Sequence, residues 1–217
     1  MADHERTEPD RTERRFEVVS TLILAMAALA TAWAGYQASL WDGIQSSDYS
    51  RASALRTTSS EKQIEAHEYR LADLSVFENF VDARVSGDKE LASFYRQRFR
   101  PELAVAYTAW VALDPWKSSA AEVPPSPFSM PEYQLELDQE SDDLLHEAEA
   151  TFAAGEDANT YSDIFTLGTL LFAAALFFAA VSERFEYRAA RSSLLGIAVL
   201  ALVGGIAVVA TQPITSG

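Results

Sequence analysis

The chain has 217 residues and no cysteine, and 32 acidic residues against 17 basic ones give it a net charge of -15. The lack of cysteine excludes disulfides, thiolate metal sites and cysteine nucleophiles. The negative charge argues against a nucleic-acid partner, because phosphate recognition needs clustered Lys and Arg. The mean hydropathy is close to zero, but the apolar residues are gathered in three stretches, which is typical of a membrane protein.

The chain begins with a polar segment and a first apolar stretch. Residues 1–17 have mixed charge and too few apolar side chains for a core, so we expect a disordered cytoplasmic tail. Residues 18–40 are uncharged and predict transmembrane helix 1, since a bilayer core needs about 20 apolar helical residues. Trp33, Tyr36 and Trp41 gather at its far end, where an aromatic belt belongs.

An alternative interpretation of the start is a cleaved export signal. Arg14 and Arg15 precede the apolar run, and Ala28, Leu29 and Ala30 could form a cleavage site. Against cleavage, the leading segment holds six acidic residues and the apolar run continues well past Ala30. These features favour an uncleaved anchor.

Two further apolar stretches lie near the C-terminus. Residues 161–182 predict transmembrane helix 2, and residues 193–211 predict transmembrane helix 3. Residues 183–192 between them form a predicted cytoplasmic turn, and residues 212–217 a C-terminal tail on the outer side.

The orientation is predicted from the basic residues close to the spans. Arginines precede span one and fill the turn between spans two and three, whereas no Lys or Arg follows span three. Because positive charge favours the cytoplasmic side, we expect the N-terminus and the turn inside and the C-terminus outside. The arginines concerned are Arg14, Arg15, Arg184, Arg188 and Arg191.

Residues 41–160 predict an acidic, helical, extracytoplasmic domain. No proline occurs between residues 43 and 85, so the first span is expected to continue outward as one long helix that ends near Gly87, a residue suited to a left-handed cap. Pro101 should kink or split the next helix. A third helix is expected over about residues 132–154.

Apolar spacing suggests which side chains this domain buries. A stripe at three- and four-residue intervals predicts a packed face on the first helix. A run from 103 to 113 is too short to span a bilayer, so we expect it, with Trp110, to be a buried core helix. The stripe consists of Leu71, Leu74, Phe77, Val81 and Val85.

No motif for catalysis, nucleotide binding or cofactor binding is present, so we predict no enzyme activity, no catalytic residues and no cofactor. His146 shares a helix face with Asp142 and Glu149. Asp143 and His146, three residues apart, also resemble one arm of a bundle metal site. The second arm is missing, because Ile64 stands at the required offset from His67. We therefore predict a solvated acidic face and no metal.

Small residues recur along the first helix at steps of about four. Such spacing lets helices approach closely in lipid and predicts a helix-packing seam, whose partner is either a second copy or another span of the same chain. The seam consists of Gly35, Ser39, Gly43, Ser46 and Ser50, and Ala54 continues it.

Two segments carry a resemblance to a known family. TAWAGYQASLWD closes the first span, and FFAAVSERFEYRAARSS forms the final hairpin. This layout resembles an uncharacterised family of three-span bacterial membrane proteins, grouped as a domain of unknown function. The resemblance implies the three-span topology and carries over no functional residues.

Together these features predict an all-α protein in which three transmembrane helices carry an extracytoplasmic antiparallel helical hairpin or bundle. The predicted function is a non-enzymatic, self-associating scaffold or interaction component of the cell envelope, located in the cell (plasma or inner) membrane. Its expected partners are the lipid bilayer, further copies of itself and an unidentified envelope protein. The alternative is a small channel or transporter subunit with an acidic, cation-gathering vestibule.

Overall fold

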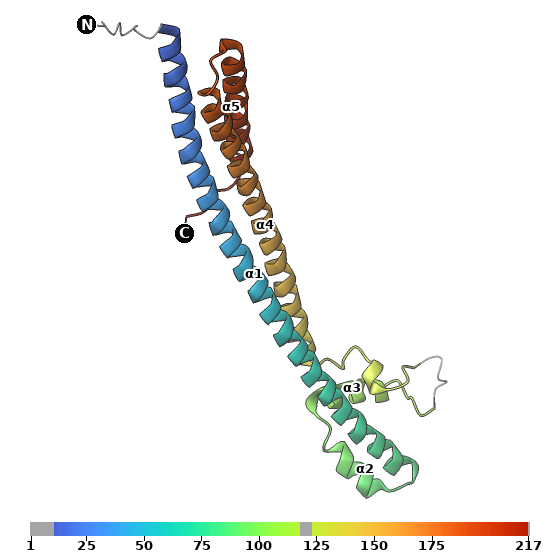
Figure 1. Ribbon diagram of the computed structural model, residues 1–217. Helices are drawn as coiled ribbons and strands as arrows, with labels where there is room; N and C mark the ends of the chain where they lie inside the picture. The colour runs from blue at the N-terminus through green and yellow to red at the C-terminus, as the bar shows by residue number, and fades with distance from the viewer. Residues whose placement is uncertain (1–10, 118–122, 217) are drawn as a thin grey trace, which may run out of the picture. The chain divides into compact units, whose positions relative to one another are not determined.

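The computed structural model describes residues 11–117 and 123–216. Every regular element in these ranges is helical, and they contain no strand, which confirms the all-α prediction (Figure 1). The elements are α1 (Arg11–Val85), α2 (Lys89–Arg96), α3 (Pro101–Val111), the 3-10 helix η1 (Pro127–Ser129), α4 (Glu136–Ser182) and α5 (Arg188–Val209).

Three of these helices, α1, α4 and α5, are long and apolar enough to cross a membrane. This confirms that the three apolar stretches form helices of membrane-spanning length. The chain divides into two compact units. The apolar unit comprises residues 11–50 and 151–216 of the described chain, and the polar unit comprises 51–117 and 123–150.

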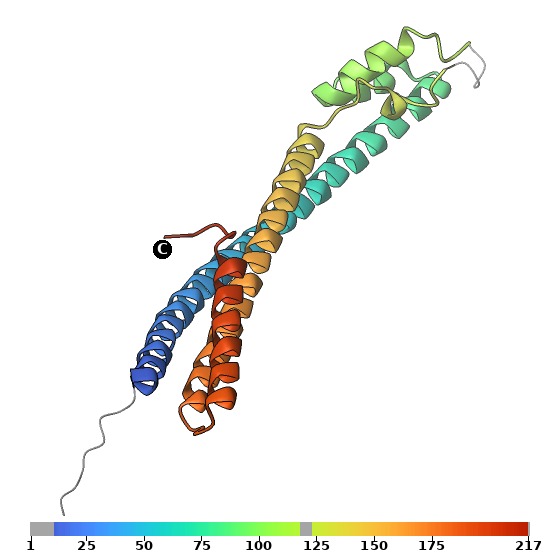
Figure 2. The ribbon, with the colours of Figure 1, turned by 90° about the horizontal axis from the view of Figure 1, so that it is seen from above.

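The apolar unit consists of three antiparallel helical segments. Figures 1 and 2 show α4 and α5 side by side, joined by a short turn. The start of α1 lies at this turn, because the Ser20 hydroxyl donates a hydrogen bond to Glu183 at 2.8 Å. The core between the helices is built from small and large apolar side chains in contact, among them Ala27, Ala34, Phe165, Phe172 and Leu202.

The C-terminal segment of the apolar unit is attached to α1 by hydrogen bonds. The Gln37 amide donates to the Thr215 carbonyl at 3.1 Å and accepts from the Thr215 amide at 3.2 Å. The Trp41 indole donates to the Pro213 carbonyl at 3.2 Å. Gln37 is buried, so these bonds satisfy a polar group that would otherwise be costly there.

The polar unit begins with the second half of α1, which ends at Val85, close to Gly87 as expected. This glycine has a positive φ of 82°, and the Asp88 amide donates back to the Ala83 carbonyl at 2.9 Å. Asp88 then caps α2 by accepting from the Leu91 amide at 2.9 Å. The chain can turn here because glycine adopts the left-handed conformation without a steric penalty.

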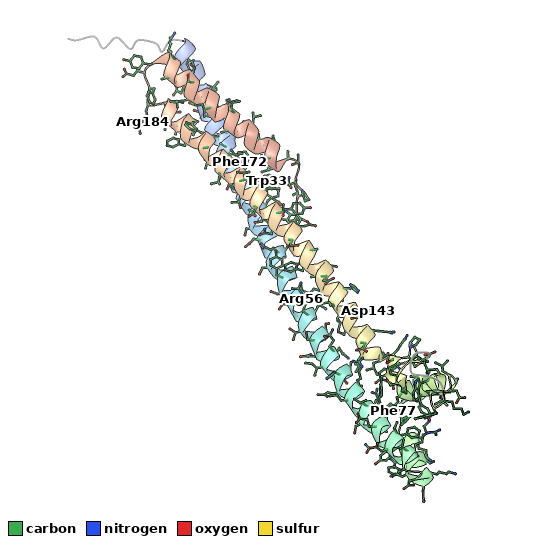
Figure 3. The ribbon with its side chains drawn as sticks, turned by 90° about the vertical axis from the view of Figure 1, so that its right-hand side faces the viewer. Trp33, Arg56, Phe77, Asp143, Phe172 and Arg184 are labelled. Atoms are coloured by element: carbon green, nitrogen blue, oxygen red, sulfur yellow. The ribbon has the colours of Figure 1, made fainter. Side chains whose placement is uncertain are left out.

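Pro101 splits the second predicted helix in two, as expected. It occupies the first turn of α3, where its missing N–H removes no hydrogen bond. The aromatic core of the polar unit lies between α3 and the end of α1, and Figure 3 shows Phe77 among these side chains. The buried members are Phe77, Phe80, Phe99, Leu103, Tyr107 and Trp110, so the predicted burial of Trp110 is confirmed.

Several predicted boundaries differ from the structure. Helix α1 already begins at Arg11, so residues 11–17 are helical rather than disordered, and residues 1–10 lie outside the described ranges. Arginine and glutamate are good helix formers, and an established helix propagates at little cost. For the same reason α5 begins at Arg188, and the turn occupies 183–187 rather than 183–192.

The prediction that the apolar stripe on α1 is buried is also only partly correct. Phe77 is buried and Val81 is partly buried, but Leu71, Leu74 and Val85 are exposed. The buried positions are instead Asp73, Phe77, Phe80 and Ala83. Helix α4 continues through Gly155, because that glycine packs against a tyrosine of α1 rather than ending the helix.

Candidate functional site

The predicted packing seam lies on an exposed face of α1. All five of its residues are exposed to solvent within the chain, as is Ala54. A Cβ added to Gly43 would meet no atom within 4 Å, and one added to Gly35 would meet only Thr169, at 3.9 Å. Apart from this contact at Gly35, the seam is therefore not the surface through which α1 packs on α4 and α5. The five residues are Gly35, Ser39, Gly43, Ser46 and Ser50.

The chain's own helix contacts use a different face of α1. Its buried small residues recur every seven positions, at Ala27 and Ala34 in the apolar unit and at Ala52, Ser59 and Ala66 in the polar unit. A seven-residue repeat keeps one side of a helix turned toward its partner, as in a coiled coil. Since each residue advances the helix by about 100°, this face and the seam lie roughly 150° apart.

Helix α4 carries the matching repeat. It buries Ser141 and Ala148 in the polar unit, and Phe165, Phe172 and Ala179 in the apolar unit. The alternation of small and large side chains brings the helix backbones close at some levels and fills the gap at others. Serine and alanine give only a weak hydrophobic signal, so hydrophobicity does not predict this repeat; the seven-residue spacing of these small residues is the available clue.

Three glycines of the apolar unit mark places where no side chain fits. A Cβ on Gly155 would lie 2.7 Å from the Tyr49 ring, and one on Gly205 would lie 2.5 Å from the Phe172 ring. A Cβ on Gly168 would collide with Val209. Helices in lipid associate through close approach of this kind. Within the chain, these three glycines allow the helices to approach closely.

A buried group of charged side chains lies at one edge of the aromatic core in the polar unit. Asp73 is 2% exposed and accepts a hydrogen bond from the Tyr133 hydroxyl at 3.0 Å. Arg100 lies 3.6 Å from Asp73 and 3.1 Å from Glu102. The Arg100 guanidinium thus pairs with two carboxylates and links the start of α3 to α1.

Burial dominates the electrostatics of this group. It raises the pKa of the Asp73 carboxyl above its ordinary value, against the opposing effects of Tyr133 and Arg100. Burial and the neighbouring Asp73 also raise the pKa of the Tyr133 phenol. A terminal nitrogen of Arg100 and one oxygen of Glu102 are buried with no hydrogen-bond partner. The arrangement is that of a structural ion pair between α1 and α3.

The acidic face of α4 brings few potential metal ligands together. His146 is largely exposed and lies 3.9 Å from Glu149. Within residues 11–117 and 123–216, no three His, Asp or Glu side chains are placed to hold a metal ion together. Other acids of α4 form ion pairs with α1, namely Glu147 with Arg51, Glu140 with Lys62 and Asp138 with Arg70.

Comparison with protein families, with curated proteins and with solved structures finds no match to this chain. The resemblance to a three-span bacterial family therefore stays a prediction.

Proposed function

We propose that this is a non-enzymatic integral membrane protein of the cell (plasma or inner) membrane that self-associates and acts as a scaffold or interaction component of the envelope. Three helices anchor it, and the polar unit forms its extracytoplasmic domain. The observation that carries the proposal is the small-residue seam of α1, which the chain leaves exposed while it packs through another face.

Membrane insertion is supported by the surface of the apolar unit. Leu29 is 74% exposed and Leu200 is 73% exposed, and Leu170 and Phe177 are exposed as well. Such a dense set of exposed large apolar side chains is rare on a water-soluble protein. Lipid would cover this surface, and the continuous helices keep their backbone hydrogen bonds internal, as a bilayer requires.

The charge distribution supports the orientation. Arg14 precedes the apolar stretch of α1, and Arg184, Arg188 and Arg191 lie at the turn between α4 and α5. Figure 3 shows Arg184 at this end of the apolar unit. Positive charge at one end of the spans favours that end as cytoplasmic. Residues 51–150, which contain the polar unit, carry 19 acidic residues against ten Lys and Arg, and would then face outward.

Self-association through the seam is supported by the space around it. A methyl group added to Gly43 would have no neighbour within 4 Å, and Ser50 satisfies its hydroxyl on the Ser46 carbonyl at 2.8 Å. The Ser50 hydroxyl therefore presents no unsatisfied donor to lipid or to a partner. A surface of small side chains lets a second helix approach closely, where dispersion and weak Cα–H contacts accumulate.

The test replaces Gly35 and Ser39 with leucine in the full-length protein and measures its mass in detergent by light scattering coupled to size exclusion. We expect wild type to be an oligomer and the double variant a folded monomer by circular dichroism. The matched control is Ala173→Leu with Ala180→Leu, which adds comparable bulk at two exposed positions of α4. A monomeric wild type, or an oligomer unaffected by the seam change, would overturn the proposal.

A further inference from the structure

An apolar groove lies between α1 and α5 in the apolar unit. Its volume is about 600 Å³, within the range of about 300–1,000 Å³ typical of small-molecule sites. The lining is almost entirely apolar, with Ser192 as its polar member. The other residues are Phe16, Val19, Leu195, Gly196, Val199 and Leu200.

A cationic side chain stands beside this groove. The guanidinium carbon of Arg191 lies 5.2 Å from the centre of the Phe16 ring, and Phe16 is one of the lining residues. The Nε of Arg191 is buried and has no hydrogen-bond partner. That nitrogen is closed to solvent, but the Arg191 side chain as a whole is only partly buried, so an anion can approach its accessible part.

The nearby charges leave this position open to an anion. Glu183 accepts the hydrogen bond of Ser20 at 2.8 Å, and Glu186 is exposed in the turn. Neither forms an ion pair with Arg191 within the described residues. Arg184 lies in the same turn but does not line the groove.

We infer that the groove binds an anionic phospholipid, with one acyl chain along the apolar lining and the phosphate at Arg191. The inference rests on the proposed membrane location, in which the arginine-rich end lies at the cytoplasmic headgroup level. Basic pockets between transmembrane helices on that side suit anionic lipid heads. The apolar lining and the cation together match an amphipathic ligand, whereas a second copy of α1 would offer the seam, which contains no anion.

The groove and the seam are separate surfaces. Phe16 and Val19 fall on α1 near the face that packs within the chain, which lies roughly 150° from the seam by the helix repeat. A change in the groove can therefore be made without touching Gly35 or Ser39. This separation allows lipid binding and self-association to be measured independently.

Gly196 offers a way to fill the groove. A Cβ added there would meet no atom within 4 Å, so leucine should occupy the space of the acyl chain without disturbing the helix contacts. Gly204 on the same helix is also free of neighbours within 4 Å of an added Cβ but does not line the groove. It is the matched control for Gly196, and Arg184 is the matched control for Arg191.

The experiment uses native mass spectrometry of the full-length protein in detergent, titrated with phosphatidylglycerol or with phosphatidylcholine. We expect wild type to retain phosphatidylglycerol preferentially. Gly196→Leu, which fills the space of the acyl chain, and Arg191→Gln, which removes one basic contact, should each lower the apparent affinity for phosphatidylglycerol about five-fold or more. Gly204→Leu and Arg184→Gln should leave it unchanged.

Equal lipid retention in all five proteins would overturn the inference, because binding would then be unspecific coating. A change of oligomer mass on Gly196→Leu, without loss of lipid, would assign the groove to a second copy instead. Failure of the membrane proposal is recognised separately: the protein would remain in the soluble fraction after cell lysis without detergent. A detergent-dependent protein with no site preference would contradict the lipid site alone.

Discussion

Ser59 of α1 and Ser141 of α4 exchange hydrogen bonds across the polar unit. The Ser59 hydroxyl donates to the Ser141 carbonyl at 2.9 Å, and the Ser141 hydroxyl donates to the Ser59 carbonyl at 3.0 Å. Both side chains are buried, with 3% and 0% exposure. The two helix backbones meet here at a distance that only small side chains permit.

Ser141→Leu should therefore destabilise the polar unit. Forcing extra bulk into a packed interface typically costs about 1–3 kcal/mol, and Ser59→Ala, which only removes hydrogen bonds, should cost about 1 kcal/mol. The free energy of unfolding is measured by chemical denaturation of the full-length protein in detergent. Ser60→Ala, at an exposed neighbour, serves as the control, and equal stability of Ser141→Leu and this control would disprove the close approach.

Gly155→Ala should destabilise the apolar unit. The added methyl would lie 2.7 Å from two ring carbons of Tyr49, and that ring is stacked on Phe152 with 5.0 Å between centroids. Since the ring cannot move without losing this contact, we expect a loss of about 1–3 kcal/mol. Gly204→Ala is the control: an added Cβ there meets no atom within 4 Å, so alanine should stabilise the helix by up to about 1 kcal/mol. Thermal unfolding followed by circular dichroism should show shifts of opposite sign.

Trp110→Ala should be among the most damaging single changes in the polar unit. Trp110 is 5% exposed, its indole donates to the Pro124 carbonyl at 2.7 Å, and its ring meets Phe77 edge-on at 5.9 Å. Truncating a buried aromatic costs about 3–5 kcal/mol. Trp116→Ala removes a 40% exposed ring and should cost less. The melting temperature and the near-ultraviolet circular dichroism report the difference, and similar losses in both variants would contradict this core.

The sequence predicts the order and approximate extent of the helices well. Stretches of about 20 apolar residues, the capping glycine at Gly87 and the proline at Pro101 act through local physics, so their consequences can be derived without tertiary information. The aromatic core around Trp110 follows from a short apolar run that has no membrane role. Each of these features appears in the structure where the sequence places it.

Apart from the helix boundaries, the features missed from the sequence depend on which face of a helix meets a partner. Leu71 and Leu74 look like core residues by spacing, but the buried position next to them is Asp73, which Arg100 and Tyr133 make tolerable through contacts from distant segments. The packing repeat of α1 uses alanine and serine, so hydrophobicity alone points to other residues. The spacing of small residues predicts which residues form the seam, but it does not predict which helix packs against them.

Asp73 should make the stability of the polar unit depend on pH. Burial raises the pKa of its carboxyl above the unfolded value of 3.8, so between 3.8 and that raised value the folded state binds more protons than the unfolded state. The contribution of Asp73 to the free energy of unfolding therefore decreases as the pH rises through this interval. Arg100 and Tyr133 oppose the shift, and Glu102 adds to it.

Asp73→Asn isolates this contribution from that of the other carboxylates. The stability of the variant relative to wild type should increase as the pH is raised through the interval and level off above it. Denaturation curves at several pH values provide the measurement, with Asp82→Asn, at an exposed position of α1, as the control. A difference between variant and wild type that is constant with pH would show that Asp73 titrates normally.

The proposed topology can be tested with single cysteines, because the native chain has none. Cysteine at Ser60 in the polar unit or at Ser216 near the C-terminus should react with a membrane-impermeant maleimide in intact cells. Cysteine at Tyr187, which is 80% exposed in the turn between α4 and α5, should react only after the membrane is permeabilised. The physical reason is that arginines close to a span favour the cytoplasmic side, and Arg184 and Arg188 lie on either side of Tyr187. Because all three positions are exposed in the folded chain, burial cannot account for a missing reaction. Labelling of Tyr187→Cys in intact cells, with Ser60→Cys protected, would reverse the orientation and place the acidic unit inside the cell.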